Sequence, residues 1–291
     1  MSEAKPSGHG RPEADRLHQS AGQDAPRGHP EKLRLGGMAL RNGLLVHGPT
    51  HWAAAIRGKD GRIQVASGPK PRLGARALDG VPGLRGVSKL AEAFAVIPLV
   101  KRRLPQAGLP MEDAKAIGGM ALAAAFSQAI RRGGQRTLGR EAAVSVLGLA
   151  PALLVLRGGE VAAYHGVEHK AIGAYEQGAD AAAATKEHER CGSNLVAPLL
   201  ATTTIGSVAA RRAGMRGSVA DSVAALGGVA IAVEIFAWSE RNAGTKLAKA
   251  LKRPGYEIQR LVGTREPTAE QLEVGRAALD EILRVEAPGA S

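Results

Sequence analysis

Four long apolar segments dominate the pattern of hydrophobic and polar positions along the chain. They are residues 116–130, 142–156, 195–210 and 218–238. A membrane-spanning helix needs about 20 apolar residues, and three of the segments fall short of that length. Taken alone, each segment therefore fits a buried helix as well as a membrane span. Their many small residues favour close helix packing in either setting.

Two shorter patterns precede these segments. Residues 51–69 predict two strands around a turn at Asp60-Gly61, a dipeptide typical of tight hairpins. Residues 84–104 predict an amphipathic helix that is kinked at Pro98 and ends in the basic run 101–103.

The chain ends in a second amphipathic pattern. Thr268 and Gln271 form a capping box, and Leu272, Leu279 and Ile282 then fall on one helical face. Together these patterns predict a mainly α fold, a helical bundle of four apolar segments. A small N-terminal β-hairpin region and an amphipathic C-terminal helix complete it.

The domain organisation follows from changes in composition. Residues 1–33 are rich in Gly, Pro, His and charges, so they predict a disordered tail without a cleavable signal peptide. The rest predicts one domain at 34–285. Its parts are a β-rich block (34–83), a helical core (84–240) that includes a metal-ligand segment (164–194), and a C-terminal block (241–285), followed by a tail (286–291).

A weak internal repeat links the apolar segments. Residues 130–136 and 210–216 share the pattern Arg-Arg-x-Gly-x-Arg at an offset of 80 residues, which predicts two helical hairpins with basic tips. Coincidence in a biased composition is the alternative. The positive-inside rule places such tips in the cytoplasm, yet the long N-terminal region is itself basic and lacks an export signal. Re-entrant or non-crossing hairpins therefore stay open.

Charge and cysteine content narrow the function classes. Lys and Arg total 39 against 27 acidic residues, a net charge of +12 that suits nucleic acid, an anionic membrane face or simply a basic protein. Aromatic residues make up only 3%, and no nucleic-acid motif is present, so no specific nucleic-acid partner is expected. Cys191 is the lone cysteine, which excludes an internal disulfide.

The candidate chemistry lies in one short segment, "YHGVEHKAIGAYEQG". His165 and His169 are four residues apart, so on a helix they lie on adjacent turns and can chelate one ion. Glu168 stands beside them as a candidate base for water activation, in the order H-x-x-E-H. A polar helix face without a metal is the alternative interpretation.

Further ligands are expected about 20 residues later. His188 and Cys191 have ligand spacing, and imidazole together with thiolate suits zinc. Four bound ligands would make a closed structural site, whereas three would leave a position open for water and substrate. The spacing does not choose between them.

Four sequence blocks resemble the YqhQ-like family of bacterial proteins. They are "GGMALRNGLLVHGP" (36–49), "YHGVEHKAIGAYE" (164–176), "HERCGS" (188–193) and "IQRLVGTREPTAEQLEVGRAAL" (258–279). The first block departs from the family pattern, because Met38, Asn42 and His47 replace Gln, Glu and Arg.

The resemblance implies a multi-pass protein of the cell (inner) membrane that depends on a divalent metal, most simply zinc. It carries the metal site over to His165, His169, His188 and Cys191. It also marks a polar cluster of unknown role at 264–266, whose simplest role is to seat the last helix. The resulting hypothesis is a zinc-dependent hydrolase with Glu168 as general base. The alternative is a non-enzymatic membrane or assembly protein with a structural His/Cys site.

Overall fold

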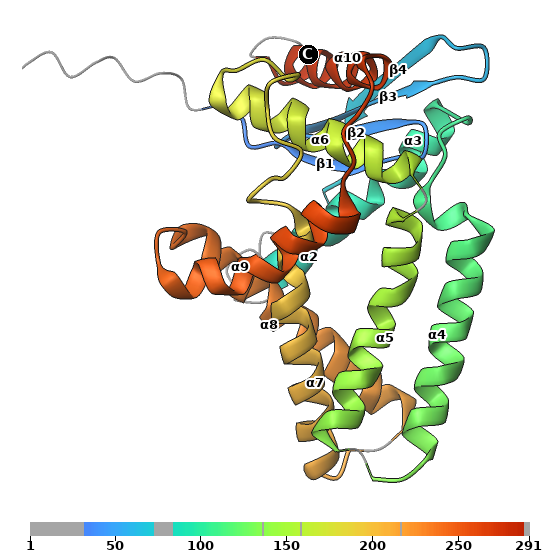
Figure 1. The fold of residues 1–291 in the computed structure, drawn as a ribbon, viewed down its shortest axis with the longest axis vertical. Coiled ribbons are helices and arrows are strands. Elements are labelled where there is room, and N and C mark those ends of the chain that lie inside the picture. Colours follow the sequence, from blue (N-terminus) through green and yellow to red (C-terminus); the bar gives the residue numbers. More distant parts are fainter. Residues whose placement is uncertain (1–31, 73–83, 136, 158, 216, 288–291) are drawn as a thin grey trace, which may run out of the picture. The chain divides into compact units, whose positions relative to one another are not determined.

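The computed structural model describes residues 32–72, 84–135, 137–157, 159–215 and 217–287. Residues 34–291 form one compact unit that is mainly helical, with a four-stranded antiparallel sheet near its N-terminus (Figure 1). The tail predicted to be disordered lies almost entirely outside the described residues. The elements are β1 (Gly36–Ala39), β2 (Gly43–His47), β3 (His51–Arg57), β4 (Ile63–Pro69), α2 (Leu84–Ala95), α3 (Ile97–Arg103), η2 (Pro110–Glu112), α4 (Ala114–Arg132), α5 (Leu138–Leu156), α6 (Glu160–Gln177), η3 (Gly192–Leu195), α7 (Val196–Arg212), α8 (Ser218–Arg241), α9 (Lys246–Ile258), η4 (Gln259–Gly263) and α10 (Ala269–Glu286).

The sheet has the strand order β1-β2-β3-β4, and both of its faces are covered. Trp52, Ala54 and Ile56 join the core that α3 completes, while Ala53 and Ala55 alternate to the face that contacts α10. The predicted hairpin around Asp60-Gly61 is confirmed as β3 and β4. Within the predicted β-rich block, strands β1 and β2 were not predicted individually. Strand β2 is buried at four of its five residues and so shows no polar alternation, and β1 is only four residues long and begins with two glycines.

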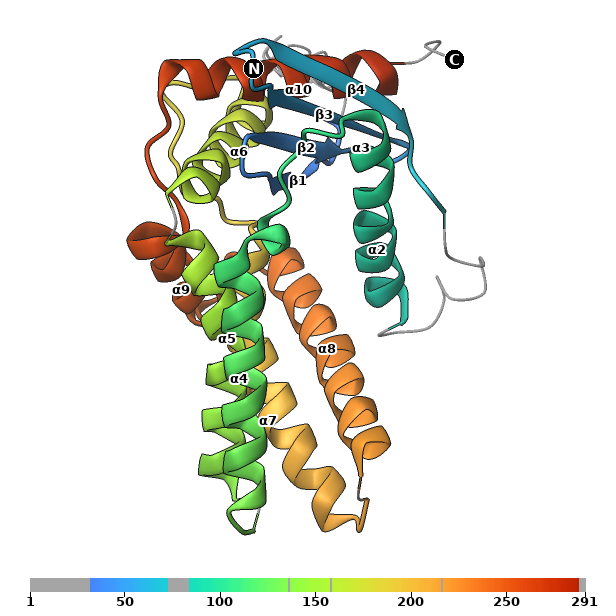
Figure 2. The same ribbon diagram turned by 90° about the vertical axis from the view of Figure 1, so that its right-hand side faces the viewer.

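The predicted helix at 84–104 is divided in the structure. Helix α2 ends at Ala95 and α3 begins at Ile97, with Pro98 in the first turn of α3. A proline is tolerated there because the first amides of a helix need no intrahelical acceptor. Helix α2 packs along α8 (Figure 2).

Two helical hairpins, α4–α5 and α7–α8, form the apolar part of the fold, and α5 contacts α7 between them (Figure 1). The Ser145 hydroxyl in α5 hydrogen-bonds to Thr204 at 3.0 Å and Thr203 at 3.3 Å in α7. Gly134 and Gly214 both adopt positive φ in the connecting turns, at positions 80 residues apart. Each turn thus has a glycine with positive φ at the equivalent position.

Each hairpin tip also contains an ion pair between an arginine and a carboxylate. Arg131 contacts Glu141 at 3.2 Å, and Arg211 contacts Asp221 at 3.1 Å. In each pair the arginine lies in the last turn of the first helix, and the acid lies ten residues later in the second. The 80-residue offset therefore relates equivalent side-chain contacts, which supports an internal repeat over coincidence.

Three helical stretches in the described part of the chain are long and apolar enough to cross a membrane. They are Leu138–Leu156, Gly192–Arg212 and Val219–Arg241. The prediction of four such segments was wrong, because α4 holds Lys115 near its start and Arg131 near its end. Only 11–17% of each stretch is buried, so most of its apolar surface is left for an apolar environment.

The C-terminal helix α10 packs on the sheet, as its amphipathic pattern and the confirmed Thr268–Gln271 capping box predicted. It runs to Glu286, one residue into the predicted tail. The Glu286 carboxylate accepts hydrogen bonds from the backbone N–H groups of Thr50 (2.8 Å) and His51 (2.7 Å) and from the Thr50 hydroxyl (2.9 Å). Burial raises the pKa of Glu286, but these hydrogen bonds outweigh it and hold the pKa below its ordinary value of 4.5.

Replacing Glu286 with alanine should lower the free energy of unfolding by about 1–3 kcal/mol at neutral pH, because a charged acceptor is removed. A carboxyl group whose pKa is lowered in the folded state contributes its full stabilisation of the fold at pH values above its ordinary pKa. That stabilisation is lost as the pH falls through the lower folded value. Thermal unfolding of both proteins from pH 7 to pH 3 should show the difference shrinking below pH 4.5.

Glu273→Ala, which removes an exposed pair with Arg57, is the matched control and should change the free energy of unfolding little. A constant difference at all pH values would contradict this account.

Candidate metal centre

Helix α6 carries both histidines and is buried on most of its surface. Gly166 faces the backbone carbonyl of Arg265 so closely that a Cβ there would overlap it. On another face, Val167 packs against Gly275 of α10 in the same way. Glycine at these two positions holds α6 tightly in place, which fixes the direction of the side chains that it presents.

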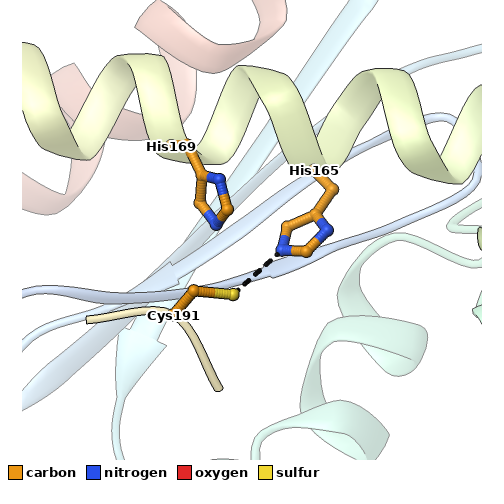
Figure 3. Close-up of side chains that lie close together, drawn as sticks. All are labelled: His165, His169 and Cys191. Carbon is orange, nitrogen blue, oxygen red and sulfur yellow. Dashed lines mark hydrogen bonds between the residues drawn. The ribbon is translucent and has the colours of Figure 1, made fainter. Parts of the chain in front are cut away.

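His165, His169 and Cys191 come together at the surface of α6 (Figure 3). Their potential ligand atoms all lie within 4.8 Å of one another, and Cys191 Sγ is 3.4 Å from His165 Nε2. The two imidazole centroids are 4.3 Å apart. Small side-chain rotations would bring these atoms to the separations that a single ion spans.

Backbone carbonyls fix the tautomer of both imidazoles. His165 Nδ1 is 2.7 Å from the carbonyl of Gly263, and His169 Nδ1 is 2.6 Å from that of Lys186. A carbonyl only accepts, so each Nδ1 carries the proton and each Nε2 keeps its lone pair. Nε2 of His169 is buried and has no hydrogen-bond partner within the described structure. Histidines that bind metals are oriented in this way.

Burial favours the uncharged forms of His169 and Cys191 in the ion-free protein. It lowers the pKa of His169 to about 2, so the ring stays neutral and its lone pair stays available. Burial, reinforced by the nearby Glu168 carboxylate, raises the pKa of the Cys191 thiol to about 11. The Ser193 N–H donates to Cys191 Sγ at 3.4 Å and opposes that shift. A cation is what would convert this thiol to a thiolate at neutral pH.

Glu168 lies beside the cluster, against β1. A side chain at Gly37 would overlap its carboxyl group, and the backbone N–H of Ala39 hydrogen-bonds to it. Burial raises the pKa of Glu168, although His165 and the Ala39 N–H oppose the shift. A carboxyl group with a raised pKa is suited to take and return protons near neutral pH.

His188, the fourth predicted ligand, is not among the clustered residues. Its Nε2 lies 3.0 Å from a carboxylate oxygen of Glu176, and its Nδ1 accepts the Arg190 N–H at 3.3 Å. Arg190 also pairs with Glu176. Both ring nitrogens are thus occupied, although the ring centroid is only 5.7 Å from that of His169. The structure brings together three of the four predicted ligands.

A comparison with known protein families matches the part of the chain that contains the candidate ligands. Residues 159–285, from the start of α6 to the end of α10, match the family model "Protein of unknown function (DUF1385)". The chain is also 27% identical, over 311 aligned residues, to the "Uncharacterized protein YqhQ" of Bacillus subtilis (strain 168). That alignment covers 89% of this chain and 95% of the relative.

The chain resembles YqhQ over most of its length. These matches confirm the predicted resemblance to a family of uncharacterised bacterial proteins. No solved structure matches the chain. The residues matched by the family model include His165, Glu168, His169 and Cys191, but neither match names a metal or an activity.

Of the three departures in the N-terminal block of the YqhQ-like pattern, Met38 alone lies near the cluster, where it lines a cavity beside Glu168. Asn42 instead hydrogen-bonds to three backbone groups, at Arg57, Gln106 and Gly108. The departure at Asn42 therefore has a structural role.

His47, the third departure, contacts Gly36 and lies 3.4 Å from Lys70 Nζ. Burial, with the nearby Lys70 charge, lowers the pKa of His47 to about 4. It faces away from the candidate ligands, and like Asn42 it offers them no group.

The polar cluster at 264–266 of the YqhQ-like pattern seats the elements around α6. Thr264 is buried and donates to the Gln259 carbonyl at 3.0 Å, and the Arg265 N–H donates to the Ala162 carbonyl at 2.9 Å. Glu266 pairs at 2.6 Å with Lys170, which is buried on α6. These contacts favour the seating role over catalysis.

Sequence reasoning missed the residues that hold the ligands in place. The π-helical turn η4 presents the Gly263 carbonyl to His165. Gln259, fully buried in that turn, accepts the His188 N–H and donates to Ser193, both at 2.8 Å. It thereby ties residues 178–191, the Cys191 loop between α6 and η3, to the C-terminal block. In the sequence, only the resemblance of residues 258–279 to the family pattern pointed to this region, and that resemblance did not assign a role to Gln259.

A largely apolar cavity of about 630 Å³ reaches the cluster. His165, Glu168 and Cys191 are part of its lining. The walls come from β1, η2, α4, α5 and α7. Apolar residues of α5 contribute the longest stretch, from Gly148 to Leu156. The site therefore combines candidate ligands and a candidate base with an apolar approach.

Proposed function

We propose that the chain is a metal-dependent hydrolase of the inner membrane, in which His165, His169 and Cys191 hold one divalent ion, most simply zinc. The orientation of the imidazoles carries the proposal. Both Nδ1–H groups are directed to carbonyls, so two neutral Nε2 atoms are left beside a thiol. Nitrogen and sulfur donors in this number suit zinc. The three apolar stretches support a membrane location.

In the proposed reaction, the ion held by the three ligands and the Glu168 carboxylate have different roles. A bound ion would supply Lewis acidity and a water of lowered pKa. Glu168 would take a proton from water as the water oxygen bonds to the substrate carbonyl carbon. It would then return that proton to the leaving group as the scissile bond breaks. Three protein ligands leave one position open for water and substrate, as in catalytic zinc sites.

A structural metal site in a non-enzymatic membrane or assembly protein is the second candidate. It requires a fourth protein ligand. The His188 ring lies close to that of His169, but Glu176 and the Arg190 N–H occupy its nitrogens. That arrangement favours the open, three-ligand site over the closed one.

Metal content tests the site directly. Protein purified from the membrane fraction should hold about one zinc ion per chain by elemental mass spectrometry. His165→Ala/His169→Ala and Cys191→Ala should lose it. His188→Ala is the matched control, since it removes a neighbouring imidazole outside the cluster, and should keep the ion. Wild-type protein without metal, or loss in His188→Ala alone, would overturn the proposed ligand set.

Cobalt substitution separates the two candidate functions. In an open site the visible spectrum of bound cobalt should change when azide is added, because azide takes the position left free by the protein. Glu168→Gln should retain the metal, since Glu168 is not a ligand in this scheme. A spectrum insensitive to azide would favour the structural role.

A further inference from the structure

The apolar cavity brings a specific class of molecule to the candidate ligands. We propose that it holds one acyl chain of a membrane lipid, with the carbonyl end of the chain at His165, Glu168 and Cys191. This inference names the substrate class of the site and so rests on the proposed function.

The size and polarity of the cavity match an amphiphile. Its volume of about 630 Å³ lies within the range of small-molecule sites. The groups in its lining that can react, His165, Glu168 and Cys191, all come from α6 and the Cys191 loop. Elsewhere the walls are mainly apolar, including Met111, Met120, Leu149, Leu153, Leu156 and Val196. An apolar chain with a carbonyl at one end places each part in matching surroundings.

The position of the cavity indicates that the chain enters from the bilayer. Helix α5, which forms much of the wall, is one of the three candidate spans. Met111 and Met120 line the cavity and are also 50% and 45% exposed, so the cavity opens beside them. Ile117 and Leu154 are exposed on α4 and α5. A lipid tail would pass from hydrocarbon into the cavity without crossing water.

Two glycines of the α4–α5 hairpin provide a matched test. Gly148 lines the cavity, and a side chain there would meet no atom within 4 Å, so phenylalanine would extend into open space. Gly118 on α4 is equally open, but it does not line the cavity. Gly148→Phe should therefore block the acyl site, while Gly118→Phe adds the same bulk outside it. Ala152→Trp is a second blocking variant.

The experiment uses the full-length chain in bilayer discs of phosphatidylethanolamine and phosphatidylglycerol. The probe is palmitic acid with a mid-chain diazirine and a terminal alkyne. Wild type should crosslink saturably within residues 148–156, and unlabelled palmitic acid should compete. This labelling should fall at least about tenfold in Gly148→Phe and Ala152→Trp and stay unchanged in Gly118→Phe. Equal labelling in all four proteins, or labelling that does not saturate, would overturn the inference.

Measuring zinc in the same samples distinguishes this inference from the proposed function. Retained zinc without saturable labelling would refute the acyl site and leave the metal site standing. Saturable labelling that the blocking variants abolish, in protein without zinc, would refute the metal-dependent reaction and retain the acyl site. Thermal unfolding of each variant verifies that loss of labelling is not loss of fold.

Discussion

Replacing Gly166 with alanine should destabilise the protein by about 1–3 kcal/mol, the range for an overpacked interior position. The added Cβ would overlap the Arg265 carbonyl oxygen, and a backbone atom cannot rotate away as a flexible side chain can. The Arg265 segment is held to α6 by the 2.9 Å hydrogen bond to the Ala162 carbonyl. The clash would therefore separate α6 from the turn whose Gly263 carbonyl orients His165.

Gly173→Ala, seven residues later in the same helix, is the matched control. A Cβ at Gly173 would lie 3.7 Å from the His188 ring, an ordinary contact. Both substitutions gain about 1 kcal/mol of helix propensity, so their difference isolates the clash. Thermal unfolding in one detergent should show a lower midpoint for Gly166→Ala, by about 2–4 °C for each kcal/mol, and no decrease for Gly173→Ala. Equal midpoints would refute the close packing of α6.

Replacing Gln259 with leucine should weaken both the fold and the metal site. Gln259 is completely buried, and its side-chain amide accepts the His188 N–H and donates to Ser193. Leucine is of similar size but makes neither bond. A buried N–H left without a partner costs about 1–3 kcal/mol. Because the same bonds position the Cys191 loop, metal affinity should fall about 10–100-fold, as it does when residues that orient metal ligands are lost.

Gln177→Leu controls for the loss of a glutamine, since Gln177 is exposed at the end of α6. Competition with a chromophoric zinc chelator measures affinity, and thermal unfolding measures stability. Both quantities should drop for Gln259→Leu alone. Unchanged zinc affinity together with reduced stability would show that Gln259 supports the fold without positioning Cys191.

The features that the sequence predicted are those set by neighbouring residues. The Asp60-Gly61 turn, the Thr268–Gln271 cap and the pairing of His165 with His169 each depend on a few consecutive residues whose geometry the backbone fixes. The two helical hairpins were predicted from the Arg-Arg-x-Gly-x-Arg pattern that is repeated at their tips. The count of spans was wrong because charges at both ends of α4 shorten its apolar stretch.

The sequence by itself determined a mainly helical chain that resembles YqhQ, with apolar segments and a pair of candidate ligands one helical turn apart. Only the tertiary structure decided that Cys191, and not His188, reaches that pair, because Glu176 and Arg190 occupy the His188 ring. It also decided that Glu168 lies against β1 and that a cavity leads to the site. Such choices depend on packing between residues far apart in the chain, which local spacing does not constrain.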